Sequence, residues 1–416
     1  MEDHYKTIHA DEDSSMSIIK PKATVVCFKE LPLSICLVLW TILSIASSLA
    51  QQISMPIAIW TFGNTAGAYA ILLICSTFFN VIFWIWTYIR YTKNQISKET
   101  FDNLKFGTKI FWMIIAVGVC DALNGILTVF SSSPKRVPPV LQPILLQSYI
   151  FFTLIISKFW LKKHYKLKQY LNAFLVIVGI VVSLIPLFIQ IANGGDTEFQ
   201  SGYLWGVMMF FSPLPAVMMS VLQEELYDKI RGFDIILFLA LESLIQMLFI
   251  MFCFWIDLIP GFGTASSFSE LVTNLTDNIS CIFFSLHTPG THCNYCAALI
   301  LFFSLAYCGS YVYTAELIKY ASANFCAMVS STVAPLATSW WIIFPAMNAW
   351  IDGPPTDSRD LIWYVFSMLI IIPASFFFKR DEMEDKARRL GQIHKKQAVD
   401  SGSTQDSTMD PGLDGL

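Results

Sequence analysis

The chain has 416 residues, of which 55% are hydrophobic and 14% charged, and its formal net charge at pH 7 is −4. A soluble domain carries about a quarter charged residues, and a soluble protein of this length has no core large enough to bury so many apolar side chains. The composition therefore predicts an all-α protein that crosses a lipid bilayer several times. The net charge is nearly neutral and the sequence has no basic patch, so we expect no nucleic-acid partner.

The first 30 residues are polar and of mixed charge. They contain no apolar stretch followed by a small-residue cleavage site, which a secretory signal peptide requires. We interpret residues 1–30 as a cytosolic N-terminal tail.

Ten apolar runs follow, each long enough to cross about 30 Å of hydrocarbon. They lie at residues 33–53, 66–89, 109–130, 138–161, 167–192, 202–226, 233–258, 297–318, 322–345 and 360–378. With a cytosolic N-terminus, 24 of the 27 Lys and Arg residues fall on the cytosolic side, and only Lys135, Arg136 and Arg359 fall on the other. Because cytosolic loops are enriched in Lys and Arg, this distribution predicts ten spans with both termini in the cytosol.

Ten spans divide into two halves of five. Because five is an odd number, the second half must be inverted relative to the first. The predicted domains are the N-terminal tail 1–30, a first five-helix repeat 31–194, a second five-helix repeat 195–380 with a long lumenal loop at 261–296, and a cytosolic C-terminal tail 381–416. The end of that tail is rich in Ser, Gly and Asp, which is typical of disorder.

A proline lies at a corresponding place in each half, in Gln142-Pro143 of the fourth run and in the segment from Thr332 to Pro335 of the ninth. Proline inside a span leaves a backbone carbonyl without its helical partner, and protein or water must then satisfy that carbonyl. One proline alone indicates a helix kink. Two at matching points of inverted halves favour a central cavity.

The most deeply placed ionisable residues of the spans are acids, Asp121 in the third run and Glu242 in the seventh, and no Lys or Arg lies deep in any run. A carboxylate at the bilayer centre costs at least about 2.5–3.5 kcal/mol, so it must be protonated, solvated in a cavity or bound to a partner. Asn124 lies one helical turn from Asp121 on the same face. These acids are candidates for proton coupling. The alternative is a protonated acid that hydrogen-bonds across a helix interface.

Other polar residues of the spans are candidates for the wall of the cavity: Gln142, Gln147, Gln246, Ser330, Ser331 and Thr332. Each of them alone is more often a contact between packed helices than a ligand contact. Glu224 and Glu225 lie near the cytosolic end of the sixth run, where we interpret them as candidates for a cytosolic gate.

The loop 261–296 contains no Lys or Arg and carries two glycosylation sequons, at Asn274 and Asn278. Three cysteines follow, and on the lumenal side they allow one disulfide with one thiol left over. They are Cys281, Cys293 and Cys296. A zinc site made of His287, His292, Cys293 and Cys296 is the alternative, and it is disfavoured because such sites occur where thiols stay reduced. We therefore expect no metal.

An ordered series of short motifs resembles the chloroquine-resistance-transporter-like family of the drug/metabolite transporter superfamily. The series covers about residues 31–380 and consists of Cys120-Asp121-Ala122, Gln142-Pro143, Lys162-Lys163-His164-Tyr165, Leu171-Asn172-Ala173, Gln223-Glu224-Glu225 and the run from Tyr307 through Trp341 centred on Ser330 to Pro335. The resemblance implies ten helices in a five-plus-five inverted repeat, with helices one to four and six to nine around the cavity. It also implies a lumenal loop with two disulfides from four cysteines, whereas this loop has three.

The family resemblance implies a carrier in a vacuolar, lysosome-like or plastid membrane, for amino acids, small peptides, glutathione-type thiols or cationic drugs. We therefore expect a proton-coupled secondary active transporter that exports small zwitterionic or cationic metabolites from an acidic compartment. Its partners would be the small-molecule substrate, protons and the lipid bilayer. We expect a monomer or weak homodimer without a cofactor.

Two further hypotheses remain. One is a transporter of glutathione-like thiols in an organelle envelope or of nucleotide sugars, although nucleotide substrates favour Lys or Arg in the cavity and none is seen. The other is a receptor or scaffold that does not transport. No catalytic motif, such as Gly-x-Ser-x-Gly or His-Glu-x-x-His, indicates an enzyme.

Overall fold

The structure is a computed structural model. It describes residues 22–23, 31–63, 68–96, 107–160, 165–192, 202–229, 234–286, 291–321, 323–352, 359, 361–374, 376–377 and 380. Apart from residues 22–23, the two predicted tails lie outside these described ranges.

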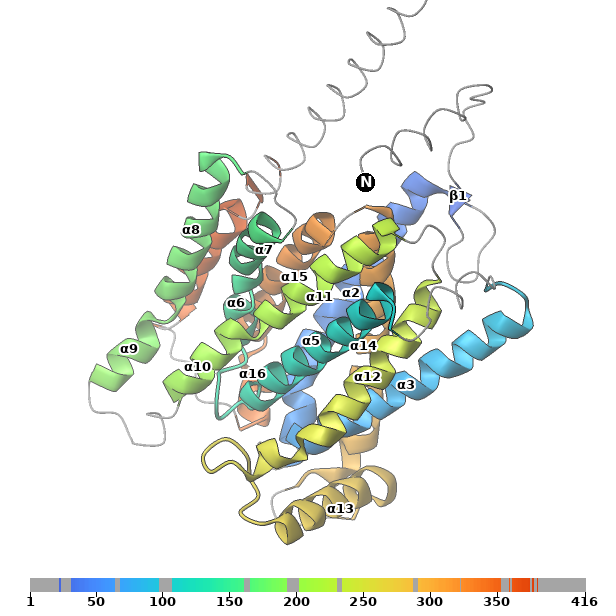
Figure 1. Ribbon diagram of the computed structural model, residues 1–416. Helices are drawn as coiled ribbons and strands as arrows, with labels where there is room; N and C mark the ends of the chain where they lie inside the picture. Colours follow the sequence, from blue (N-terminus) through green and yellow to red (C-terminus); the bar gives the residue numbers. More distant parts are fainter. Residues whose placement is uncertain are drawn as a thin grey trace, which may run out of the picture.

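Helices make up nearly all of the described chain (Figure 1). They are α2 (Leu33–Trp60), α3 (Ala68–Thr92), α5 (Lys109–Ser131), α6 (Gln142–Leu145), α7 (Ser148–Phe159), α8 (Leu167–Ser183), α9 (Ile185–Ala192), α10 (Gly202–Phe211), α11 (Pro213–Lys229), α12 (Ile235–Phe252), η1 (Cys253–Leu258), α13 (Phe268–Phe284), η2 (Cys293–Tyr295), α14 (Cys296–Tyr320), α15 (Ala323–Ile343) and α16 (Pro345–Trp350). A minimal antiparallel ladder pairs β1 (Lys22–Ala23) with β2 (Leu31–Pro32), with Lys22 opposite Pro32.

Within the described ranges, 8 helical segments are long and apolar enough to cross a membrane. They are Leu33–Trp60, Ala68–Thr92, Lys109–Ser131, Gln142–Phe159, Leu204–Tyr227, Ile235–Leu258, Cys293–Tyr320 and Phe325–Ile343. The predicted fifth and tenth spans correspond to two shorter apolar helices, Leu167–Ser183 and Leu361–Ala374. The chain is therefore an all-helical, multi-pass membrane protein, and the count of ten spans stays a prediction.

Several spans are interrupted where a proline begins a new helix. Pro143 and Pro186 occupy the second positions of α6 and α9, and Pro213 is the first residue of α11. Proline is accepted at the start of a helix because the first backbone N–H groups have no helical partner there. Pro186 and Pro213 divide the fifth and sixth predicted spans into α8–α9 and α10–α11. Pro143 instead marks the start of the fourth span, whose break between α6 and α7 lies at Leu146 and Gln147.

The helices of the two predicted halves interleave. Helix α2 packs against α14 and α15, α3 packs against α12, and α5 packs against α11 and α12. A close approach lies at Gly118 of α5, where an added Cβ would lie 2.7 Å from the Cβ of Ile245 and 2.9 Å from the carbonyl oxygen of Glu242. Only a residue without a side chain lets α5 and α12 come this close.

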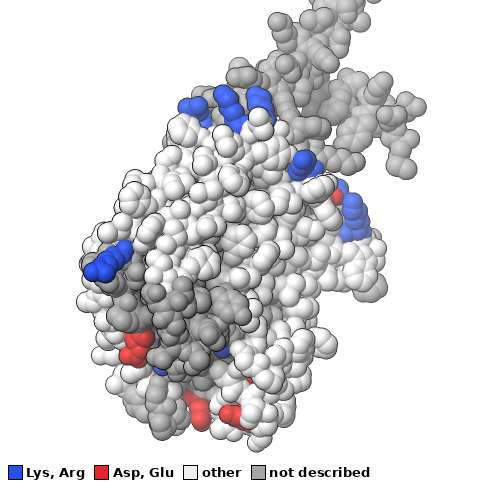
Figure 2. Space-filling view, turned by 90° about the vertical axis from the view of Figure 1, so that its left-hand side faces the viewer, with Lys and Arg blue, Asp and Glu red and all other residues white. Residues whose placement is uncertain are grey.

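The surface has the pattern expected of a protein in a bilayer. Figure 2 shows Lys and Arg mainly at the upper end of the visible face, Asp and Glu mainly at the lower end, and a broad surface between them that is mostly uncharged. Large apolar side chains are exposed on the spans, among them Phe302, Phe366 and Leu369 at 54%, 55% and 63%. Lipid is the solvent that such a surface requires.

Candidate functional site

A cavity of about 200 Å³ opens between α2, α5, α7, α11, α14 and α15. Its polar lining residues are Gln52, Asn124, Gln147, Tyr149, Ser220, Thr314, Ser330 and Ser331. Among the described residues, no Lys, Arg, Asp or Glu lines it. The predicted residues Asn124, Ser330 and Ser331 thus share one cavity wall, to which both predicted halves contribute.

The proline of α15 acts on this wall. Because Pro335 has no N–H, the carbonyl of Ser331, four residues earlier, loses its helical donor. The side-chain amide of Gln147 donates to that carbonyl at 3.4 Å. The freed backbone group therefore lies at the cavity, between the second-half helix α15 and the interrupted fourth span. Thr332 is exposed, and its hydroxyl donates to the carbonyl of Val329 rather than lining the cavity.

Gln142 and Pro143 have a different position. Gln142 is buried, and its amide donates to the carbonyls of Ser132 and Val137, both at 2.9 Å. This side chain holds the turn between α5 and α6. Neither Gln142 nor Pro143 lines the cavity.

Two prolines that were not predicted as site residues also lie at the cavity. Pro56, inside α2, follows Gln52 by four residues, so it removes the helical donor of the Gln52 carbonyl, and Gln52 lines the cavity. Pro213 lines the cavity directly. The available signals were a proline three residues beyond the first apolar run and another within the sixth.

Asp121 is fully buried on α5, one turn before Asn124. The hydroxyl of Tyr311 donates to its Oδ1, and the hydroxyl of Tyr307 lies 3.5 Å from the same atom. The two tyrosine hydroxyls are 2.7 Å apart. The second carboxyl oxygen, Oδ2, is buried and has no hydrogen-bond partner in the described part of the chain.

Aromatic stacking holds the tyrosine hydroxyls in place. The rings of Phe79 and Tyr307 stack with centroids 4.5 Å apart and an interplanar angle of 3°, and those of Tyr307 and Tyr311 stack at 4.5 Å and 25°. Stacked rings restrict the rotamers of both tyrosines. Helix α3 therefore supports an Asp121 site that is made by α5 and α14.

Glu242 of α12 is also buried, and the amide of Gln223 donates to its two carboxyl oxygens at 3.5 and 3.3 Å. One turn along α12, the buried side chain of Gln246 lies near the hydroxyl of Tyr307, and Glu242 and Asp121 are close enough to interact electrostatically. The two predicted acids thus belong to one buried polar layer. Gln246 lies in this layer rather than in the cavity wall.

Neither Asp121 nor Glu242 has an ion-pair partner among the described residues. Both carboxyl groups instead have neutral hydrogen-bonding neighbours. A proton is the smallest species that can neutralise such a group, and hydroxyl and amide groups can accommodate either protonation state by reorienting.

The gate candidates tie helices together at the predicted cytosolic end. Glu225 forms ion pairs with Lys109 of α5, at 3.4 Å, and with Lys229, and it accepts a hydrogen bond from the indole of Trp160 at 3.0 Å. Glu224 accepts from the backbone N–H of Ala323 at 3.3 Å. These contacts connect α11 to α5, α7 and α15.

Arg136 ties the helices at the opposite end. Its guanidinium donates to the carbonyls of Phe130 (2.7 Å) and Phe262 (2.8 Å) and lies 3.7 Å from the ring centroid of Trp205. Removal from water lowers the pKa of Arg136 to about 10, while the nearby Asp257 opposes this shift. The cation in the short 132–141 turn is therefore a link between the two predicted halves, whereas Lys135 is exposed.

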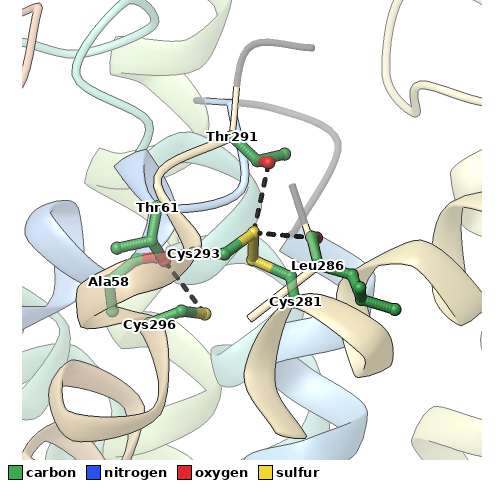
Figure 3. Close-up of a disulfide and its surroundings, with 7 residues drawn as sticks. All are labelled: Ala58, Thr61, Cys281, Leu286, Thr291, Cys293 and Cys296. Carbon is green, nitrogen blue, oxygen red and sulfur yellow. Dashed lines mark hydrogen bonds between the residues drawn. A yellow bond between two sulfur atoms is a disulfide. The ribbon is translucent and has the colours of Figure 1, made fainter. Parts of the chain in front are cut away.

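The loop 261–296 forms helix α13, and a disulfide joins Cys281 of α13 to Cys293 of η2 (Figure 3). Cys296 is a free thiol that accepts a hydrogen bond from the hydroxyl of Thr61 at 3.5 Å. Cys293 is occupied by the disulfide, and His287 of the zinc alternative lies outside the described residues.

Both sequons lie on α13. Asn278 is only 4% exposed, whereas the Asn274 side chain is partly exposed. The structure therefore presents the two asparagines very differently to solvent.

The fold and its buried polar layer define a multi-pass helical membrane protein with a central cavity. A family model described as CRT-like, chloroquine-resistance transporter-like, matches residues 37–371. The chain belongs to this family, and the resemblance seen in the motifs is confirmed.

Curated relatives include Crt homolog 1 of Dictyostelium discoideum, 29% identical over 47% of this chain and 38% of the relative. A putative chloroquine resistance transporter of Plasmodium chabaudi is 22% identical over 53% and 48%, and the chloroplastic protein CLT2 of Arabidopsis thaliana is 24% identical over 60% and 56%. The chain thus spans less than two thirds of the length of each of these relatives.

Proposed function

We propose that the chain is a proton-coupled secondary active transporter that exports small zwitterionic or cationic metabolites from an acidic vacuole-like compartment to the cytosol. The observation that carries the proposal is a cavity between the two predicted halves, with Asn124 in its wall and the buried Asp121 one turn away on α5. Membership of a family with members named as transporters supports the general activity.

The packing pattern supports an inverted five-plus-five repeat. In such a repeat the first span (α2) corresponds to the sixth (α11), and the third (α5) corresponds to the eighth (α14). The contact between α2 and α14 therefore has its counterpart in the contact between α11 and α5. The same correspondence maps α7–α11 onto α15–α2, and both pairs pack together. Such repeats work by rocking one half against the other around a central site.

The cavity wall favours a small cargo that forms hydrogen bonds. Pockets for drug-sized ligands are about 300–1,000 Å³, and this cavity, at about 200 Å³, is smaller. Its amide, hydroxyl and freed carbonyl groups can bind the ammonium and carboxylate groups of an amino acid or short peptide. The lack of Lys and Arg in the described wall disfavours nucleotide sugars.

One alternative has support of its own. Two relatives are named as chloroplastic proteins, CLT2 and CLT1 of Arabidopsis thaliana. A carrier of glutathione-like thiols in an organelle envelope is therefore the second candidate. Locating the tagged protein in cells distinguishes the two candidates. A plastid location would favour the carrier of glutathione-like thiols over the vacuolar exporter of amino acids or short peptides.

Transport assays in proteoliposomes test the proposal. We expect uptake of labelled amino acids or short peptides to depend on an imposed pH gradient. Asp121→Asn should abolish uptake at unchanged expression, whereas Asp277→Asn, the same substitution on α13, should leave it intact. Wild-type rates for Asp121→Asn would remove this residue from coupling, and ligand binding without flux would favour a receptor.

A further inference from the structure

Helix α13 lies at the lower end of the bundle in Figure 1. It packs against α3, η1 and α14, and its last turn is tied to η2 by the Cys281–Cys293 disulfide. Helix α13 is therefore outside the spans but fixed to their ends.

The sides of α13 differ in chemistry. The side packed on the bundle carries Leu271, Asn278, Cys281 and Ile282, all buried. Next to it is an exposed apolar stripe, which consists of Phe268, Val272, Ile279 and Phe283, exposed by 61%, 46%, 38% and 69%. At 3.6 residues per turn these four side chains fall within about 60° of one another.

The remaining side of α13 is mostly polar, and the stripe lies between it and the buried side. It carries Thr273, Thr276, Asp277 and Ser280. Helix α13 thus has apolar surface on two sides, and the described protein covers only one of them. In water the uncovered side is unfavourable, at about 25 cal/mol per Å² of apolar surface.

The exposed stripe continues the lipid-facing surface of the spans. The ring of Phe268 meets that of Phe254 in η1 with centroids 5.8 Å apart. Phe254 is followed by Trp255, 47% exposed, and preceded by Phe252, 72% exposed at the end of α12. The contact between Phe254 and Phe268 therefore joins the exposed apolar residues at the end of the seventh span to the stripe on α13.

The charges exclude another mode of membrane binding. Residues 261–296 contain no Lys or Arg, and α13 carries the acids Glu270 and Asp277. Anionic headgroups would not attract this helix, so its attraction to a membrane must come from the apolar stripe.

We propose that α13 is an interfacial helix whose stripe inserts into the leaflet that borders the lumenal end of the bundle. The occupant of the stripe is the acyl-chain region of the lipid rather than a second protein. The polar side faces water, and the disulfide couples the depth of α13 to α14, the span that carries Tyr307 and Tyr311. The proposal does not depend on transport.

Site-directed spin labelling of the full chain in liposomes tests it. Replacing one residue at a time by p-acetylphenylalanine and attaching a hydroxylamine nitroxide avoids the native cysteines. The labelled stripe positions are Phe268, Ile279 and Phe283. The matched controls on the polar side of α13 are Thr273 and Asp277, and the lipid reference is Phe302 of α14.

We expect oxygen to relax the stripe labels more than a water-soluble nickel chelate does, as at Phe302. At Thr273 and Asp277 we expect the nickel chelate to relax the label more than oxygen does. Equal access of the nickel chelate to stripe and control positions would overturn the proposal. So would dipolar broadening at the stripe that disappears on dilution with unlabelled protein, because the occupant would then be a second copy. Three stripe positions keep the test decisive if one variant fails to fold.

Discussion

The hydrogen bond from Tyr311 to Asp121 yields the sharpest test of the buried site. Tyr311→Phe removes only the hydroxyl, which donates to Oδ1 of Asp121 and contacts the hydroxyl of Tyr307. Because Oδ2 of Asp121 has no partner among the described residues, the carboxyl then keeps only the 3.5 Å contact with Tyr307. Losing a buried hydrogen bond of this kind costs about 1–3 kcal/mol.

If that free energy is lost from the rate-limiting step, transport slows by about 5- to 150-fold, at 1.4 kcal/mol per factor of ten. The assay is proton-driven uptake in proteoliposomes, with thermal unfolding in nanodiscs as the measure of stability. Tyr313→Phe is the matched control, because Tyr313 lies on the same helix and is likewise partly buried. We expect that control to transport at the wild-type rate.

A double-mutant cycle tests whether Tyr311 acts through Asp121. In an Asp121→Ala background no carboxyl remains to accept the bond, so Tyr311→Phe should lower the unfolding temperature less than it does in the wild type. An equal decrease in both backgrounds would refute the reasoning, as would wild-type transport by Tyr311→Phe.

Three more predictions follow from close packing and burial. Gly118→Ala should lower the unfolding temperature, because overpacking costs about 1–3 kcal/mol, while Gly206→Ala, with no atom within 4 Å of the added Cβ, should not. Arg136→Lys should destabilise the protein by an amount visible in thermal unfolding, since a lysine cannot donate to two carbonyls and stack on an indole in the same way; an unchanged midpoint would show that the link is dispensable. Endoglycosidase treatment should shift the mobility of Asn278→Gln but not of Asn274→Gln, and the opposite pattern would mean that α13 leaves its packed position.

The spacing of residues predicted which side chains share a face of one helix. It did not predict contacts between helices that are distant in the sequence. Asp121 and Asn124 share a face of α5 because they are one turn apart, which any helix dictates. Tyr311 was not expected at this site, although it lies in the segment that carries the family resemblance. Its partner is 190 positions away, and an aromatic residue in an apolar run is usually a packing residue.

The fourth apolar run shows how local backbone chemistry changes a boundary. The sequence predicts a span from residue 138, which puts Gln142 inside the bilayer and favours it as a cavity residue. In the structure the helix begins only at Gln142, because Val137 and Pro138 each precede a proline, which disfavours the helical conformation, and the chain forms a turn there. Gln142 therefore satisfies the carbonyls of that turn, and Gln147, beyond the break at the end of α6, reaches the cavity.

The prolines around the cavity connect backbone chemistry to selectivity. Pro56 and Pro335 each remove the N–H that would have satisfied a carbonyl four residues earlier, at Gln52 and Ser331, and both of those residues line the cavity. The Gln147 amide satisfies one of these carbonyls and is the kind of group that a cargo ammonium could displace. Because no charged side chain lines the described wall, a cargo charge would be balanced by such dipoles.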